Sequence, residues 1–245
     1  MLEYPAPPEF KSIEEHKGIS IPIGEAASWI ESNTERVASA VQRYFHPHPD
    51  QGKVFQGQHF EWFISRSDPS RFSADDLAAV GTLAVTVPGQ TGRRLIEDPD
   101  GTFRSLLARC HAAVANQGLA GPALNLATCP DDWIESADSP FALLYNEVRK
   151  LPGVGYVTCS KLIAAKFPAL IPIRDGRVEK MLDLQEDRHW WRPIRELLQS
   201  GKVQEALSGI TLLPGAPDAT TLRRLDVALW MEARSRGIGD RKAAR

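Results

Sequence analysis

Apolar residues recur at helical spacing along most of the chain. Ala26, Ile30 and Val37 fall on one face and predict a first helix over 25–45. The segment 54–64 is rich in aromatic residues and fits either a short strand or a helix. Alternation of apolar and polar positions, which marks a half-buried strand, is rare elsewhere. The pattern therefore predicts an all-α, or nearly all-α, fold.

Start signals divide the rest of the pattern into separate helices. Ser73, with Asp76 three residues later, forms a partial capping box before a helix over 74–85. Ser139 followed by Pro140 is an N-cap with proline at the first helical position. Further helices are predicted over 91–97, 102–116, 140–150, 156–167, 176–184, 190–199, 203–207 and 220–235.

Composition supports one folded unit between two irregular ends. Of the 245 residues, 42% are hydrophobic, which supplies a core, and 24% are charged, which does not suggest global disorder. We predict an irregular Pro-rich arm over 1–23, a single two-lobed helical domain over 24–235, and a basic flexible tail over 236–245.

Charge and hydropathy limit the class of partner. The net charge is −2 and the pI about 6.3. A protein that coats nucleic acid without specificity is basic overall, so DNA affinity here would come from a local patch and from backbone amides. The N-terminus lacks the pattern of a secretory signal, and the longest apolar run, 77–87, is too short to span a bilayer. We expect a cytoplasmic protein with no membrane partner.

The cysteines and histidines do not predict a metal site. Cys110, Cys129 and Cys159 lie far apart, no pair has metal-ligand spacing, and an odd number argues against a disulfide framework. Buried free thiols are expected instead. His46 and His48 alternate in a Pro-rich loop, which is weak evidence for a metal. We therefore predict no metal and no cofactor.

The strongest motif is the sequence Leu-Pro-Gly-Val-Gly at 151–155, between two predicted helices. The proline ends the first helix, and the glycines permit positive φ and close approach of another backbone. The second helix points its unpaired N–H groups and positive dipole end at the turn, where a phosphate fits. The residues predicted to bind DNA phosphate are Gly153, Val154, Gly155, Val157, Ser160 and Lys161. The alternative is a connector that uses glycine only for a sharp reversal.

Asp175 follows Gly155 by twenty residues and begins the next predicted helix. Aspartate is a favoured N-cap, so capping alone is one role for this carboxylate. Arg174 and Arg177 flank it, placed either to contact the DNA backbone or to pair with Asp175. A carboxylate next to a phosphate-binding turn is also suited to chemistry on a nucleotide.

Hairpin, helix, extended link and Asp-x-x-Val, in that order, resemble the helix-hairpin-helix DNA glycosylase superfamily, the endonuclease III and MutY group. The chain reads LPGVGYVTCSKLIAAKFPALIPIRDGRVEKML over 151–182, and its Asp-Gly-x-Val form is most similar to the MutY branch. The resemblance is sharp there, looser from about residue 72, and suggests an uncharacterised bacterial branch. It implies two helical lobes around a cleft, with the helix-hairpin-helix at about 140–167 and Asp175 as the catalytic aspartate.

Departures from the family pattern narrow the implied activity. Bifunctional members carry a lysine nucleophile where this chain has Val157, so a lyase step is not expected. No cysteine follows Cys159, so the four-Cys iron–sulfur loop of many members is absent. Several members insert a glutamine into the duplex, and Gln90 lies near that position without a firm alignment.

The resemblance implies a monofunctional DNA N-glycosylase of DNA repair, a hydrolase that excises a flipped base while Asp175 stabilises the oxocarbenium ion. Two alternatives stay open: a non-catalytic DNA-binding module in which Asp175 is only a cap, or a core reused for protein or nucleotide interaction. A base-sized pocket facing Asp175 would favour the enzyme.

Aromatic clusters offer secondary candidates, each weighed against a place in the core. Phe60, Trp62 and Phe63 fit a base pocket less well than the core, and Trp230 is expected in the core. A second cluster fits either a stacking surface for nucleic acid or a set of core anchors, and comprises Arg188, His189, Trp190, Trp191 and Arg192.

Overall fold

The computed structural model describes residues 18–45, 55–118, 125–184, 190–212 and 214–239. All regular secondary structure in these ranges is helical, which confirms the predicted all-α class for them. The elements are α1 Ile23–Ser32, α2 Thr34–Phe45, η3 Gln56–His59, α3 Phe60–Ile64, α4 Ala74–Thr82, α5 Gly89–Glu97, α6 Thr102–Asn116, α7 Asp132–Glu135, α8 Pro140–Arg149, α9 Tyr156–Ala164, α10 Gly176–Leu182, α11 Trp191–Gln199, α12 Gly201–Ser208 and α13 Thr221–Ser235.

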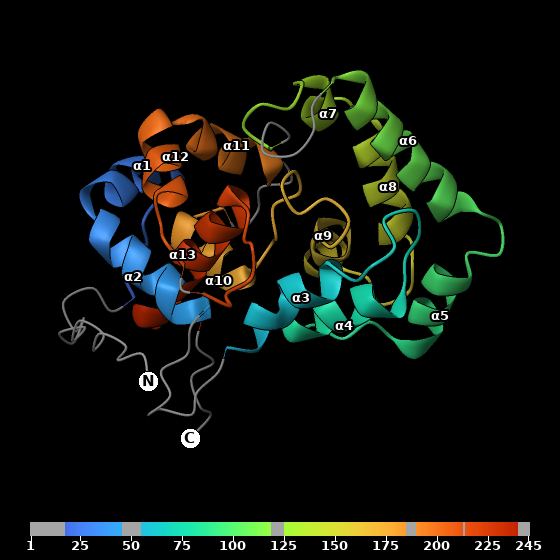
Figure 1. The fold of residues 1–245 in the computed structure, drawn as a ribbon, viewed down its shortest axis with the longest axis horizontal. Helices are drawn as coiled ribbons and strands as arrows, with labels where there is room; N and C mark the ends of the chain where they lie inside the picture. The colour runs from blue at the N-terminus through green and yellow to red at the C-terminus, as the bar shows by residue number, and fades with distance from the viewer. Residues whose placement is uncertain (1–17, 46–54, 119–124, 185–189, 213, 240–245) are drawn as a thin grey trace.

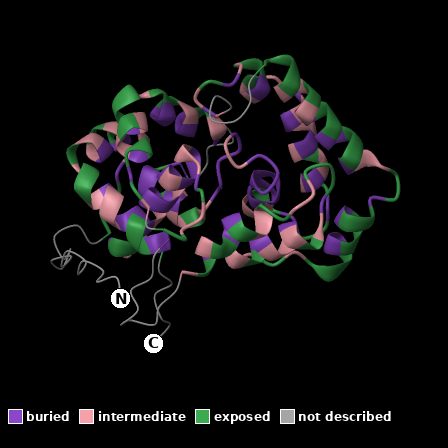
Figure 2. Cartoon of the chain, in the orientation of Figure 1, coloured by how far each residue is buried: buried purple, intermediate pink, exposed green. Residues whose placement is uncertain are grey.

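The helices form two groups (Figure 1). In one group α13 packs against α2 and α10, while α12 packs against α1 and α11. In the other group α3 packs on α4, and α6 on α8. Helix α9 contacts α8 and α4 and lies near the centre of the view, facing the first group (Figure 1). Buried residues are concentrated in α9 and α13 (Figure 2), so these two helices form the interior from which the site is built.

The first predicted helix is two helices in the structure. Asn33, at φ −130°, ends α1, and α2 begins at the next residue. The Asn33 side-chain amide donates to the Trp29 carbonyl at 2.8 Å, a local bond that competes with continued helix. The prediction of one helix over 25–45 was wrong because apolar periodicity alone does not detect such a break.

The segment 54–64 is helical over its described part, as η3 and α3, which resolves the ambiguity between strand and helix. Helix α4 ends at Thr82, earlier than predicted, because Ala84 has a left-handed backbone at φ +60°. That early end leaves the Leu83 carbonyl free to accept a bond from α9, described below.

A buried ion pair joins the start of α4 to the end of α9. Asp76 accepts the backbone N–H of Ser73 at 2.7 Å, half of the predicted capping box. Its carboxylate also meets the Lys166 ammonium at 2.6 Å, and both side chains are almost completely buried. Lys166 donates further to Ser67 Oγ and to the Asp68 carbonyl, each at 2.7 Å. All of the strong donors of this ammonium are thus satisfied inside the fold.

The C-terminal boundary is later than expected. Arg236 is buried, pairs with Glu232 at 2.7 Å and donates to the Ile19 carbonyl at 3.0 Å. The basic tail predicted to begin at residue 236 therefore starts with a packed residue. Most of the predicted N-terminal arm, residues 1–17, and the end of the tail, 240–245, lie outside the described residues.

Asp76→Ala should lower the free energy of unfolding by about 3–5 kcal/mol, because it leaves the Lys166 ammonium buried without its counter-charge. Urea denaturation measures this. Glu97→Ala is the control, since it breaks the exposed Arg93–Glu97 pair, which water screens, and should lower stability far less. Equal losses in the two variants would show that the buried pair is not a major source of stability.

Candidate functional site

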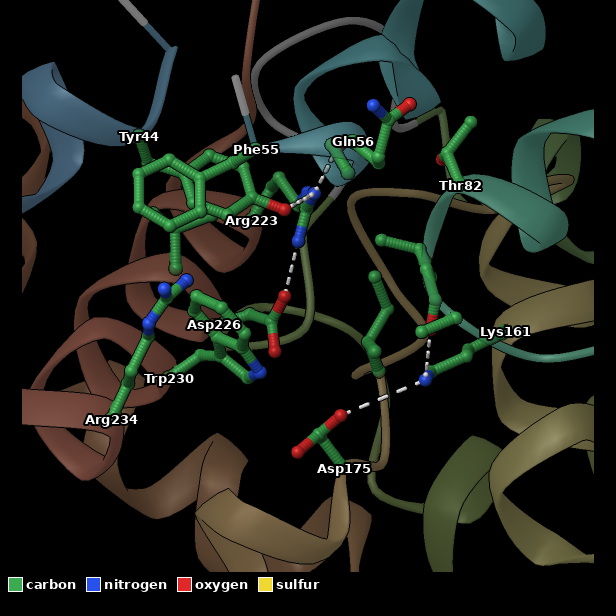
Figure 3. A pocket seen from close by; sticks show the side chains of 15 residues that line it. Tyr44, Phe55, Gln56, Thr82, Lys161, Asp175, Arg223, Asp226, Trp230 and Arg234 are labelled. Atoms are coloured by element: carbon green, nitrogen blue, oxygen red, sulfur yellow. Dashed lines mark hydrogen bonds and ion pairs between the residues drawn. The ribbon is translucent and has the colours of Figure 1, made fainter. Parts of the chain in front are cut away.

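A cavity of about 250 Å³ opens between the two helix groups, beside Asp175 (Figure 3). Its walls come from α2, η3, the end of α4, α9, the link before α10, and α13. A cavity of about 150 Å³ is enough to hold a benzene molecule. The larger volume here has room for a two-ring aromatic compound. We call this cavity the Asp175 pocket.

Asp175 uses its two carboxylate oxygens differently. One oxygen, Oδ1, accepts the backbone N–H of Arg177 at 2.9 Å and so caps α10. The other oxygen, Oδ2, lies 3.6 Å from the Lys161 ammonium across the pocket (Figure 3). Capping thus holds the carboxylate in place while leaving one oxygen turned toward the cavity.

The two arginines that flank Asp175 have other partners. Arg174 is buried and its Nε donates to the Glu179 carboxylate. Arg177 donates from Nη1 to the Ile238 carbonyl at 3.0 Å. Arg174 lies inside the fold rather than on a DNA-facing surface, and its ion pair is made with Glu179 instead of Asp175.

Lys161 and Ser160 lie inside the fold, not on the surface of the hairpin. The Lys161 side chain is 3% exposed, and its ammonium donates to the Leu83 carbonyl at 2.8 Å. Burial lowers the pKa of Lys161, an effect that the nearby Asp175 opposes. Ser160 donates to the Val157 carbonyl and accepts the Arg174 backbone N–H, both at 2.9 Å. A phosphate contact at the hairpin therefore depends on the backbone amides, not on these two side chains.

The floor of the Asp175 pocket is formed around Arg223, which the sequence patterns did not single out as functional. Its guanidinium is 5% exposed and pairs with Asp226 on the same helix. It also donates to Glu61 at 2.7 Å, to the Tyr44 hydroxyl at 3.1 Å and to the Gly57 carbonyl at 2.9 Å. The only local signal was a charged pair three residues apart, set among the buried leucines of α13.

Asp226 is the second carboxylate of the pocket. One oxygen meets Arg223, and the other faces the cavity (Figure 3). Burial raises the pKa of Asp226 to about 6; Arg223 lowers it and the neighbouring Asp175 raises it further. The pocket therefore holds one carboxyl group that keeps its proton to a higher pH than usual, next to the carboxylate that caps α10.

An aromatic wall faces the two acids. The Tyr44 and Phe55 rings are stacked, with centroids 5.3 Å apart, and Trp230 presents its edge to both. The Arg234 guanidinium lies 5.0 Å from the centroid of the Phe55 ring. Trp230, which we expected in the core, is half-buried and lines the pocket (Figure 3). These aromatic rings give one side of the Asp175 pocket an apolar surface.

Helix α9 connects the pocket to the predicted hairpin. Gly153 has φ +75°, and a Cβ there would meet Pro88 Cγ at 2.6 Å, so glycine is required at this position. Thr91 Oγ1 fixes the turn by donating to the Pro152 carbonyl at 2.6 Å. The hairpin is thus held against the start of α5, while Val154 anchors it in the core.

At Gly155, in contrast to Gly153, neither the backbone angle nor a close neighbour within the described residues requires glycine. Its φ is −84°, and a Cβ added there would meet nothing within 4 Å. It is the N-cap of α9, and no side chain of the described residues caps this end. The first amides of α9 therefore have no intrahelical acceptor, and the residues at this helix start, Gly155 and Tyr156, are exposed, an arrangement suited to binding an anion.

The other predicted candidates have varied outcomes. Phe60 is 1% exposed and belongs to the core, whereas Trp62 is 55% exposed and does not, contrary to expectation. Trp190 is buried and Trp191 half-buried; Arg188 and His189 lie outside the described residues. Arg192 is at the surface, 3.3 Å from Glu135.

The three cysteines are free and buried, as predicted. Burial raises the pKa of Cys110 to about 12 and that of Cys129 to about 11, so both are unreactive thiols at neutral pH. Across the described residues, no three His, Cys, Asp or Glu side chains gather as metal ligands would. His46 and His48 lie outside those residues. None of the described helices combines the length and apolar character needed to cross a bilayer.

Comparison with known proteins gives a family but no activity. The profile of a family described as "Family of unknown function (DUF6308)" matches residues 37–233. This range contains the hairpin, Asp175 and nearly all of the pocket lining, with Arg234 just beyond its end. No curated protein and no solved structure matches the chain.

Asp226 should make stability depend on pH in a defined direction. Its folded-state pKa of about 6 exceeds the ordinary value of 3.8, so the folded protein keeps a proton that the unfolded chain releases. Its contribution is therefore complete below about pH 4 and is lost as the pH rises through about 6. In Asp226→Asn, the free energy of unfolding should lack this decline.

Urea denaturation between about pH 4 and about pH 7 measures the effect as a difference in slope between variant and parent. Asp100→Asn is the matched control, because the Asp100 carboxylate is exposed and pairs with Arg94 at the surface. Parallel pH profiles for parent and Asp226→Asn would mean that this carboxyl titrates normally.

Proposed function

The chain belongs to the DUF6308 family, and we propose that it is a DNA-binding enzyme, a monofunctional N-glycosylase. The observation that carries the proposal is the base-sized pocket beside Asp175, with one carboxylate oxygen turned toward it. A helix cap with no further role would need no cavity in front of its second oxygen. The pocket is what a flipped nucleotide requires.

The reaction follows from the two acids and the aromatic wall. A base flipped into the pocket packs beside Phe55 and Trp230, which line it. As the bond between sugar C1′ and the base nitrogen breaks, positive charge builds on the sugar and is stabilised by the Asp175 carboxylate. The departing base takes a proton from Asp226. Water then adds to C1′ and gives its proton to Asp175.

Lys161 is a positioning residue in this scheme. Its ammonium joins the Leu83 carbonyl to Asp175, so it holds Oδ2 toward the sugar from the opposite wall. Val157 stands at the position of the lysine nucleophile in bifunctional glycosylases, and it is a half-buried apolar residue. The proposed product is accordingly an abasic site on an uncut strand.

In this proposal the hairpin binds a DNA phosphate through the first backbone amides of α9. Gly155 and Lys161 are six residues apart on α9, which corresponds to about 9 Å along the helix axis. A phosphate on the first amides of α9 would thus lie within a nucleotide or two of a sugar at Asp175. The succession of α8, hairpin, α9, extended link and capped α10 supports a glycosylase-like arrangement of the core.

A non-catalytic DNA-binding module is the second candidate. The observation in its favour is the 2.9 Å bond from the Arg177 N–H to Asp175 Oδ1, which accounts for an aspartate at this position without chemistry. The two candidates differ in whether Asp175 is needed for base release, so the following experiment separates them.

Asp175→Asn should lower base excision at least about 100-fold while leaving DNA affinity unchanged, because the amide still caps α10 but carries no charge. The substrates are duplexes with one uracil, hypoxanthine, or mismatched adenine or thymine, and released base is measured by chromatography. Gel analysis should find the parent's product strand intact until alkali is added, and borohydride should trap no covalent complex. Excision at the parental rate by Asp175→Asn, or none by the parent, would overturn the proposal.

Gly155→Ala should weaken duplex binding about tenfold or more, since the methyl group occupies the space where a phosphate approaches the amides. Fluorescence anisotropy with a labelled duplex measures affinity, and thermal denaturation should find the fold as stable as the parent. Gly24→Ala is the control, because Gly24 on α1 also has open space around it and lies far from α9 in the chain. Parental affinity in Gly155→Ala would exclude the hairpin as the phosphate site.

A further inference from the structure

A second cavity is lined in part by Arg174, whose backbone N–H donates to the buried Ser160. It measures about 140 Å³, and we call it the Trp190 pocket. Its walls are unusually aromatic and comprise Trp133, Tyr145, Tyr156, Trp190 and Trp191, with Arg174 beside them. A cavity of about 150 Å³ holds one benzene ring, so this pocket accepts a single planar ring and not two.

Trp190, one of the residues that line this pocket, carries an unsatisfied buried donor. Trp190 is 3% exposed, and its indole N–H has no acceptor in the described structure. Buried donors normally have partners, and leaving one unpaired costs free energy. Another cavity that Trp190 lines measures about 10 Å³, which is room for one water molecule at most. An acceptor on a ligand in the Trp190 pocket would remove this deficit.

Arg174 adds charge and further donors to the same wall. Its Nε is engaged by Glu179, while its guanidinium lies 5.1 Å from the Tyr156 ring and 5.9 Å from the Trp190 ring. A guanidinium in the wall repels a cationic ligand and favours a ligand with carbonyl oxygens. The pocket therefore suits a planar, neutral ring that carries an acceptor.

The Trp190 pocket adjoins the predicted phosphate site at the start of α9. Tyr156 is both the first residue of α9, directly after Gly155, and part of the pocket wall. It is 44% exposed, and the Arg149 guanidinium covers its ring at 3.4 Å. A nucleotide next to the gripped phosphate would thus have its base within reach of the aromatic wall.

We propose that the Trp190 pocket binds an unstacked pyrimidine base of the DNA strand held by the hairpin, with a ring carbonyl accepting the Trp190 N–H. This inference rests on the proposed DNA binding but not on base excision. It adds a second base site to that of the Asp175 pocket, one for reading or holding a neighbouring base. A pyrimidine fits by size, by its carbonyl and by its π-face.

The test uses labelled oligothymidine and an abasic oligonucleotide of equal length, with binding measured by fluorescence anisotropy. The parent should bind oligothymidine more tightly than the abasic strand. Trp190→Phe keeps an aromatic ring but removes the N–H, and should weaken oligothymidine binding about tenfold while leaving abasic binding unchanged. Trp191→Leu, which removes a half-buried stacking face, should act in the same direction. Trp62→Phe, at an exposed position outside this pocket, is the matched control.

The outcomes separate this inference from the proposed function. Gly155→Ala should weaken binding of both strands, because it acts on the phosphate site, whereas Trp62→Phe should bind both strands like the parent. Parental affinity of Trp190→Phe and Trp191→Leu for oligothymidine would overturn the pyrimidine site while leaving excision at Asp175 untouched. Binding of free thymidine can be compared in the parent and in Trp190→Phe. If Trp190→Phe weakened the binding of free thymidine but not of oligothymidine, the inference would also be overturned, and the pocket would be assigned to a free nucleoside.

Discussion

The candidate active site depends on the burial of one charge, that of Arg223. A guanidinium removed from water is stable only if its donors are satisfied and its charge is compensated. Here Glu61 on α3 supplies the counter-charge, and Tyr44 on α2, the Gly57 carbonyl on η3 and Asp226 on α13 accept the other bonds. These bonds place the Tyr44 ring and the Asp226 carboxyl at the pocket. The shape of the pocket and the position of its second acid are therefore consequences of a structural ion cluster.

Helix α9 has a corresponding role in the other helix group. Its start carries the open amides after Gly155, and Lys161 further along reaches Asp175 and Leu83. The pair of Lys166 and Asp76 then fixes its end to α4. One rigid element thus sets the spacing between a predicted phosphate site and a carboxylate. Positioning on a helix holds functional groups more accurately than a loop would.

Much of the fold was predictable because helix signals are local. The Ser73 N-cap, the Ser139-Pro140 start and the glycine hairpin each act through neighbouring φ and ψ angles or bonds a few residues away. The predictions failed where a local side-chain bond interrupted the apolar pattern, as at Asn33. They also failed where the burial of a residue depends on contacts with segments far away in the sequence. For that reason Trp62, expected in the core, is exposed, and Arg236, expected in a flexible tail, is buried.

By itself the sequence determined the helical class, the hairpin with its left-handed Gly153, and the position of Asp175 at a helix start. Only the tertiary structure decided what faces that carboxylate. Arg223 and Tyr44 are 179 residues apart, and Lys161 meets a carbonyl 78 residues away. No periodicity relates such positions, because buried charges select their partners by proximity in the folded chain and not by spacing along it.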